Sequence, residues 1–224
     1  MDQVCRRLSD EIRTELADAG GWLPPERELA GRLGVSRPVV REAAKRLELQ
    51  GLVEIQHGIG IRMVDKLHKP LNGSLELLVR DETERLRQLN ETRLAIEPEA
   101  ARLAATRIRP AQLRRLQAIQ AELEAAPDIP AAITVDMAFH RAVAEASGNQ
   151  MFRLILDSLA EIGMASRQRT IGRVGKQTAI EHHRAVIEAI GAGNEHAAQD
   201  AMRHHILAAG DDMKLPTGRR AKRA

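Results

Sequence analysis

The chain of 224 residues has little of what stabilises small secreted or β-rich proteins. It contains one cysteine, Cys5, so no internal disulfide can form and a reducing cytoplasm is the expected compartment. Aromatic residues make up 1% of the chain and hydrophobic residues 43%, so the core must be built mainly from Leu, Ile, Val and Ala. This bias favours close-packed helices over a β-sandwich.

Long apolar runs are also missing. No stretch approaches the ~18 consecutive apolar residues that indicate a membrane-spanning helix. The N-terminal segment lacks the apolar core of a signal peptide. We therefore expect a protein with no membrane partner.

Positive charge is concentrated in two places. The formal net charge is +3, but five of the 34 basic residues lie in the 214–224 tail, which we expect to be disordered. Without these five, 29 basic residues face 31 acidic ones, so overall charge is no argument for nucleic acid. The 32–46 segment, by contrast, carries five basic residues against Glu42 alone. This local excess is what a DNA-binding surface requires.

Apolar residues at helical spacing predict a first helix over residues 4–17. A second, short helix begins after Pro24-Pro25 and ends at Gly34, in the position that a left-handed C-cap favours. Ser36 is expected to cap a third helix, which Gly51 ends.

Residues 52–64 alternate apolar and polar positions around His57-Gly58, which predicts two short strands joined by a tight turn. Three helices followed by a hairpin make a winged helix-turn-helix. We assign this domain to residues 1–65 and a Pro/Gly/Ser-containing linker to residues 66–74.

From residue 75 to 213 helical periodicity is almost continuous, with no candidate strand. Asn149 is well placed to cap one of these helices. The predicted helices are 75–80, 83–106, 110–125, 129–147, 149–170, 175–192 and 194–210. The expected fold is therefore mainly α, with a winged helix-turn-helix followed by an antiparallel helical bundle.

The first candidate site is the N-terminal end of the third helix. A helix-turn-helix inserts this end into the major groove. Arg37 and Arg41 are four residues apart, so they share one face and can each span guanine O6 and N7. Arg27 opens the preceding helix, where a phosphate fits, and His57-Gly58 could enter the minor groove. A lone arginine pair is more often a solvated basic face, but the ordered pattern favours DNA.

The stretch LPPERELAGRLGVSRPVVREAAKRLELQGLVEIQHGIG resembles the DNA-binding domain of the GntR family of bacterial transcription regulators. The resemblance covers residues 4–64. It implies DNA contacts from Arg27, Ser36, Arg37, Val39, Arg41, His57 and Gly58. We expect a homodimer whose two recognition helices contact an inverted repeat in double-stranded DNA.

The second candidate site lies in the helical region. Asp136 and His140 are four residues apart on one helix face, a spacing used by metal ligands but more often by surface hydrogen bonds. In the pair His182-His183, the second histidine lies on an apolar stripe and the first points elsewhere.

For the pair His204-His205, periodicity leaves the choice open, because either histidine can belong to an inward row. Three histidines and one aspartate on three helices can fill four positions of a divalent metal, leaving two for water or a ligand oxygen. The alternative is that two of the histidines are hydrogen-bonded core residues.

Residues 83–210 resemble the helical C-terminal FCD domain of the FadR-like subgroup of GntR regulators. The matching motifs are ETRLAIEPEAARLAA, DMAFHRAVAEASGNQMF, EHHRAVIEAI and AMRHHI. The resemblance implies the metal ligands Asp136, His140, His183 and His205, and so selects His205 over His204. It also implies that Arg93 faces the pocket and pairs with an effector carboxylate. An intrahelical ion pair between Arg93 and Glu97 is the alternative.

These patterns predict a ligand-responsive transcription regulator that is not an enzyme. Its C-terminal domain is expected to bind a divalent metal, Zn²⁺ first, with Ni²⁺, Mn²⁺ or Fe²⁺ as alternatives, and a small carboxylate effector. Acyl-CoA is not expected, because the fatty-acyl-binding members of the family lack this ligand set. One competing function is a metalloenzyme, which leaves the winged helix unexplained. The other is a constitutive DNA-binding protein with a structural metal.

Overall fold

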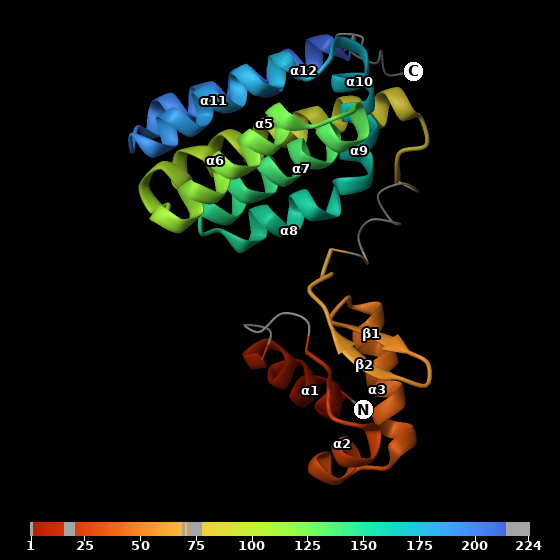
Figure 1. Cartoon of the computed structure of the whole chain (residues 1–224). Coiled ribbons are helices and arrows are strands. Elements are labelled where there is room, and N and C mark those ends of the chain that lie inside the picture. The colour runs from red at the N-terminus through yellow and green to blue at the C-terminus, as the bar shows by residue number, and fades with distance from the viewer. Residues whose placement is uncertain (1, 16–20, 69, 71–77, 214–224) are drawn as a thin grey trace, which may run out of the picture. The chain divides into compact units, whose positions relative to one another are not determined.

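The computed structural model describes residues 2–15, 21–68, 70 and 78–213 (Figure 1). The chain divides into two compact units, Met1–Ser74 and Leu75–Ala224. Most of the predicted linker and all of the predicted tail lie outside the described residues. Among the helices that are described, none has the length and apolar character needed to cross a membrane.

The first unit contains the predicted helices and hairpin, so the winged helix-turn-helix is confirmed. Its elements are α1 (Asp2–Glu15), α2 (Glu26–Leu33), α3 (Arg37–Leu49), β1 (Val53–Gln56) and β2 (Gly60–Met63). The strands are antiparallel, with Val53 opposite Met63. Apolar side chains from all five elements form one core, in which Leu8, Val40 and Leu47 are fully buried.

The turn between α2 and α3 determines how the recognition helix begins. Gly34 has φ 67° and ψ 35°, the left-handed conformation predicted for it, which glycine adopts with little steric cost. Ser36 precedes α3 as predicted, with extended φ and ψ, but its side chain makes no capping hydrogen bond. Pro38 stabilises the first turn instead, since its φ is already helical and it has no N–H to satisfy.

A third short stretch of backbone joins the hairpin. Trp22 forms an antiparallel bridge with Arg62. The N–H of Leu23 donates to the carbonyl of Ile61 over 2.8 Å, and the N–H of Met63 donates to the carbonyl of Gly21 over 2.9 Å. This contact ties the hairpin to the start of α2. The sequence analysis missed it, because a single bridge leaves no alternating pattern.

Helices are the only regular secondary structure in the described part of the second unit. Its elements are α5 (Glu82–Arg107), α6 (Pro110–Ala125), α7 (Ile129–Ala146), α8 (Gln150–Ser158), α9 (Ala160–Arg169), α10 (Ile171–Val174), α11 (Gln177–Gly191) and α12 (Glu195–Asp212). In Figure 1, α11 and α12 run side by side along one side of the unit, α8 lies on the opposite side, and α5, α6 and α7 lie between them. Apart from Phe139, the main core contains only Ala, Leu, Ile, Val and Met, as the composition predicted.

The predicted single helix over 149–170 is wrong. Asn149 caps its start by accepting from the Met151 N–H, as expected, but the helix ends at Ser158 and a new one begins after Leu159. The hydroxyl of Ser158 donates to the carbonyl of Leu154 over 2.7 Å, a bond that bends helices. The change of direction turns Arg167 of α9 into the interior.

The short helix predicted over 75–80 does not extend to residue 80. Its first part, 75–77, lies outside the described residues; Leu78 is helical, but Val79 and Arg80 are not. Asp81 instead begins α5 by accepting a hydrogen bond from the Glu84 N–H over 2.7 Å.

Candidate metal centre and nucleic-acid interface

The predicted DNA contacts gather around one groove of the first unit. Its volume is about 860 Å³, and its walls come from the start of α2, the start of α3 and the hairpin turn. Five of the seven predicted contacts line it: Arg27, Arg37, Arg41, His57 and Gly58. Ser36, which is exposed, and Val39, which is partly exposed, lie at the same end of α3 outside the groove.

Glu26, in the first turn of α2, holds two of these arginines. The Nε of Arg41 lies 2.9 Å from both carboxylate oxygens, and the Nη2 of Arg37 lies 3.8 Å from Oε2. The hydrogen bond and the charge of Glu26 raise the pKa of Arg41. All three side chains are solvent-accessible, so the pairs add little to stability. They place both guanidinium groups beside one carboxylate, an arrangement that the sequence analysis did not anticipate.

The tip of the hairpin has an open backbone at Gly58 between two exposed side chains. Gly58 has φ 77°, a conformation that residues with a side chain rarely adopt, and a Cβ placed there would meet no protein atom within 4 Å. His57 and Ile59 flank it and are exposed. The turn therefore requires glycine for its backbone conformation and presents two projecting side chains.

In the second unit, three helices bring four buried donors together. Asp136 and His140 come from α7, His183 from α11 and His205 from α12, and one ligand atom of each lies within 4.8 Å of the others. The His205 and His140 Nε2 atoms are 3.2 Å apart, and the His183 Nε2 is 3.3 Å from the Asp136 Oδ1. Donors ~2.1 Å from one ion at tetrahedral or octahedral angles are ~3.0–3.4 Å apart. This donor set and spacing fit a divalent transition metal.

The two histidine pairs are resolved by burial. His183 is fully buried and His205 is 6% exposed, whereas His182 is half-buried and His204 is exposed. On α12 the row that turns inward is therefore the one containing Met202 and His205.

His183 is the most unusual member of the cluster. Its ring stacks on Phe139, with centroids 3.7 Å apart and planes at 15°. Within the described residues, neither ring nitrogen has a hydrogen-bond partner of acceptable geometry. Burial lowers its pKa to about 4, with Asp136 opposing the shift. An unpaired buried imidazole is costly, and a bound cation would satisfy one of its two nitrogens.

Two buried ion pairs surround the cluster. The Nε of Arg93 lies 2.5 Å from the Glu97 Oε1, so the intrahelical pair that was the alternative for Arg93 is present. Arg93 also lines the pocket, with its Nη2 3.2 Å from the His140 Nε2. Glu97 hydrogen-bonds the His140 Nδ1. Burial opposes ionisation of Glu97, but the charges of Arg93 and His140 prevail and hold its pKa below the usual range.

Arg167 forms the second pair with Asp136, and the sequence analysis missed it. Burial raises the pKa of Asp136, but the charge of Arg167, the charge and hydrogen bond of His140 and the nearby His183 hold it well below its usual value. Nothing in the local pattern marked Arg167, because the bend before α9 was hidden by continuous periodicity.

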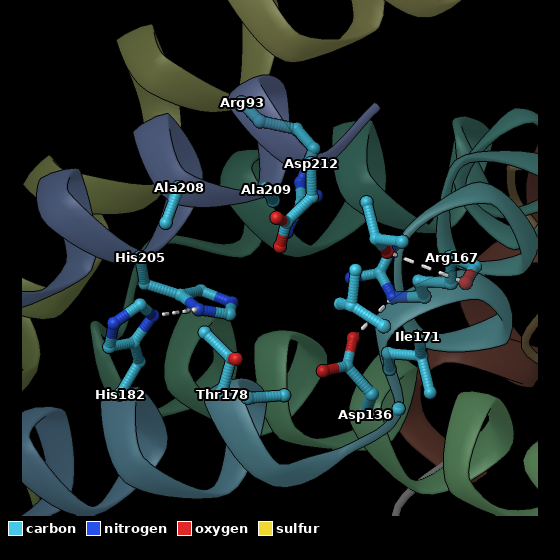
Figure 2. A pocket seen from close by; sticks show the side chains of 14 residues that line it. Arg93, Asp136, Arg167, Ile171, Thr178, His182, His205, Ala208, Ala209 and Asp212 are labelled. Atoms are coloured by element: carbon cyan, nitrogen blue, oxygen red, sulfur yellow. Dashed lines mark hydrogen bonds and ion pairs between the residues drawn. The ribbon is translucent and has the colours of Figure 1, made fainter. Parts of the chain in front are cut away.

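A small cavity opens beside the cluster. Its volume is about 30 Å³, room for about one water by the usual criterion. Figure 2 shows His182 beside His205 on one side of the pocket, and Asp136 with Arg167 on the other. Arg93 and Asp212 also line it. The site thus combines potential metal ligands with two guanidinium groups.

Comparisons with known proteins identify both units. Residues 1–63 match the family model for bacterial regulatory proteins of the gntR family, and residues 88–208 match the model for the FCD domain. The chain is 37% identical over 220 residues to an Escherichia coli (strain K12) protein named as a regulator of an L-lactate dehydrogenase operon, covering 90% of this chain and 84% of that one. It is 30% identical to the transcriptional regulator LutR of Bacillus subtilis, and the match covers 84% of this chain and 89% of that one.

A solved structure of a GntR protein from Streptococcus agalactiae is also similar. It shares 32% identity and a TM-score of 0.75 with this chain, and the match covers 92% of this chain and 97% of that one. With these matches, the fold and its basic groove define a winged-helix DNA-binding transcription regulator. The chain belongs to the GntR family and carries an FCD domain at its C-terminal side.

Proposed function

We propose that this regulator senses a small carboxylate at a metal centre. Asp136, His140, His183 and His205 would hold one divalent ion, Zn²⁺ first, with Ni²⁺, Mn²⁺ or Fe²⁺ as alternatives. The observation that carries the proposal is the convergence of four buried donors, one of which, His183, has no hydrogen-bond partner within the described residues. A bound ion would supply a Lewis acid that coordinates the effector oxygens.

The charges around the site support an anionic effector. The buried guanidinium groups of Arg93 and Arg167 balance the carboxylates of Glu97 and Asp136. A divalent ion would add two positive charges to a buried site, which is unfavourable without a counter-charge. A carboxylate would supply that charge, so metal and effector should bind cooperatively.

The site would have to widen to admit any effector. Its cavity of about 30 Å³ has room for about one water, so a small molecule needs the least rearrangement. A hydroxy acid, a sugar acid or a di- or tricarboxylate can present two oxygens to the open positions of an ion. One relative is named for an L-lactate dehydrogenase operon, and this makes a 2-hydroxy acid the first candidate to test.

On DNA, we propose a homodimer that contacts an inverted repeat. Arg37 and Arg41 would reach base edges, with Ser36 and Val39 beside them. Arg27 would bind phosphate, and His57 and Gly58 would approach the minor groove. The separation of the two recognition helices would be about one helical turn of DNA.

The test is a metal titration with and without carboxylates. Chelator-treated protein is loaded with Zn²⁺ in a calorimeter, then L-lactate, citrate and glucuronate are titrated separately into loaded and metal-free samples. We expect the effector to bind only the loaded protein and to change its affinity for an operator selected from random duplexes. A coupling free energy of ~1–3 kcal/mol would change that affinity by several-fold to a hundredfold.

The matched variants are His183→Asn, which removes a proposed ligand, and His196→Gln, which changes an exposed histidine on α12. The first should lose metal and effector response together, and the second should keep both. Full metal binding by His183→Asn would refute the ligand assignment. Metal binding without any carboxylate response would instead favour a structural ion.

A further inference from the structure

His182 contacts a proposed metal ligand from outside the cluster. Its Nδ1 lies 3.5 Å from the Nδ1 of His205, a long contact compared with the ~2.7–3.2 Å of a usual hydrogen bond. The opposite nitrogen of His205, Nε2, lies 3.2 Å from the His140 Nε2 inside the cluster. The two nitrogens of His205 therefore face different surroundings, one the centre and the other His182.

A histidine that binds a metal through one nitrogen must carry its proton on the other. In protein metal sites that N–H usually donates to a carboxylate, a carbonyl or water, which fixes both the tautomer and the ring orientation. His140 has such a partner, since its Nδ1 bonds the carboxylate of Glu97. Among the described residues, the partner of the His205 Nδ1 is His182.

The ring of His182 is itself held in place. It meets the His204 ring edge-on, with centroids 4.7 Å apart and planes at 77°, and the His205 ring at 5.6 Å and 76°. His182 thus lies against both histidines of the α12 pair, at the side of the pocket that Figure 2 shows. Although it lies off the apolar stripe of α11, it is in contact with the proposed site.

We propose that His182 is a positioning residue for the metal centre. Its unprotonated Nδ1 accepts a hydrogen bond from the Nδ1–H of His205, which leaves the Nε2 lone pair of His205 directed at the ion. This inference rests on the proposed function. It changes the expectation from periodicity, in which His182 points away from the site.

The test compares two substitutions at position 182. His182→Asn retains an acceptor, because the asparagine Oδ1 is attached to Cγ as the histidine Nδ1 is. His182→Leu removes it at similar size. His204→Leu is the control, since it removes only the edge contact. The Zn²⁺ dissociation constant of each full-length protein is measured by competition with a chromophoric chelator.

We expect His182→Leu to bind Zn²⁺ about 10–100-fold more weakly, the usual effect of losing such a partner. His182→Asn and His204→Leu should stay close to wild type. In the Zn²⁺-loaded wild type, imidazole ¹⁵N shifts should identify His205 as the Nδ1–H tautomer. The far-UV circular dichroism spectra of the metal-free variants should match that of the metal-free wild type. His182 is half-buried, so its loss should not unfold the unit.

Three results would overturn the inference. Unchanged affinity in His182→Leu would mean that the contact is incidental. Equal weakening in the Leu and Asn variants would mean that His182 does not act as an acceptor. A second bound ion, lost in both His182→Leu and His204→Leu, would mean that this pair binds metal directly. Each of these results concerns His182 alone and leaves the proposed metal centre standing. The metal centre itself would be refuted if the wild-type protein bound no Zn²⁺, so the two failures can be told apart.

Discussion

Mild acid should destabilise the metal-free second unit through His183. The pKa of this fully buried imidazole is lowered to about 4, mainly by burial, from the ~6.5 of an exposed histidine. Between these values the unfolded chain takes up a proton that the folded chain does not. The contribution of neutral His183 to the free energy of unfolding is therefore complete above pH ~6.5. It is lost as the pH falls towards the folded-state pKa.

The size of the effect follows from the shift. A difference of about 2.5 pKa units corresponds to about 3 kcal/mol in full, of which about 2 kcal/mol is lost between pH 8 and pH 5. Asp136 and Glu97 do not titrate in the folded protein between pH 8 and pH 5, because their lowered pKa values keep them ionised. His205, whose pKa is lowered by burial and by the neighbouring histidines, should add to the loss.

The assay is urea unfolding of chelator-treated protein at pH 8 and pH 5, followed by two signals. Far-UV circular dichroism reports mainly the helical unit. Fluorescence of Trp22, the one tryptophan of the chain, reports the DNA-binding unit. His183→Leu should remove about 2 kcal/mol of the pH dependence from the first signal and leave the second unchanged.

His196→Gln, which alters an exposed histidine, should behave as wild type. The reasoning would be refuted if His183→Leu lost as much stability on acidification as the wild type. It would also fail if the difference between these two proteins appeared in the Trp22 transition.

Three further predictions concern the charged residues. Arg37→Ala should cost ~1–3 kcal/mol of operator affinity and relax preference at one base pair per half-site, and an unaltered gel-shift series would contradict this. Glu26→Gln should release the arginine pair and tighten binding to unrelated duplexes more than to the operator, as competition assays would reveal; a uniform change would argue against an orienting role. Arg167→Met removes the ion-pair partner of the buried Asp136 and should destabilise the metal-free protein by ~3–5 kcal/mol. Saturating Zn²⁺ should reduce that loss, because the ion would replace the guanidinium; an equal loss with and without Zn²⁺ would count against the metal site.

The sequence by itself determined the winged helix and the helical class of the second unit. Both depend on local relations, such as helical spacing, the left-handed Gly34 and the alternation around His57-Gly58. The spacing of Asp136 and His140 on one face is also local, and so is the placement of His183 on an apolar stripe. Such features are visible because they repeat within a few residues.

Only the tertiary structure decided which parts of different elements meet. Periodicity gave no choice between His204 and His205, because either row of α12 could face α11 and α7. The bend before α9, where Ser158 makes a side-chain hydrogen bond, lies inside an unbroken helical pattern, so Arg167 could not be placed beside Asp136. The contacts of Glu26 with Arg41 and of His182 with His205 join residues on separate helices. Partners of this kind leave no trace in local spacing, since packing between elements brings them together.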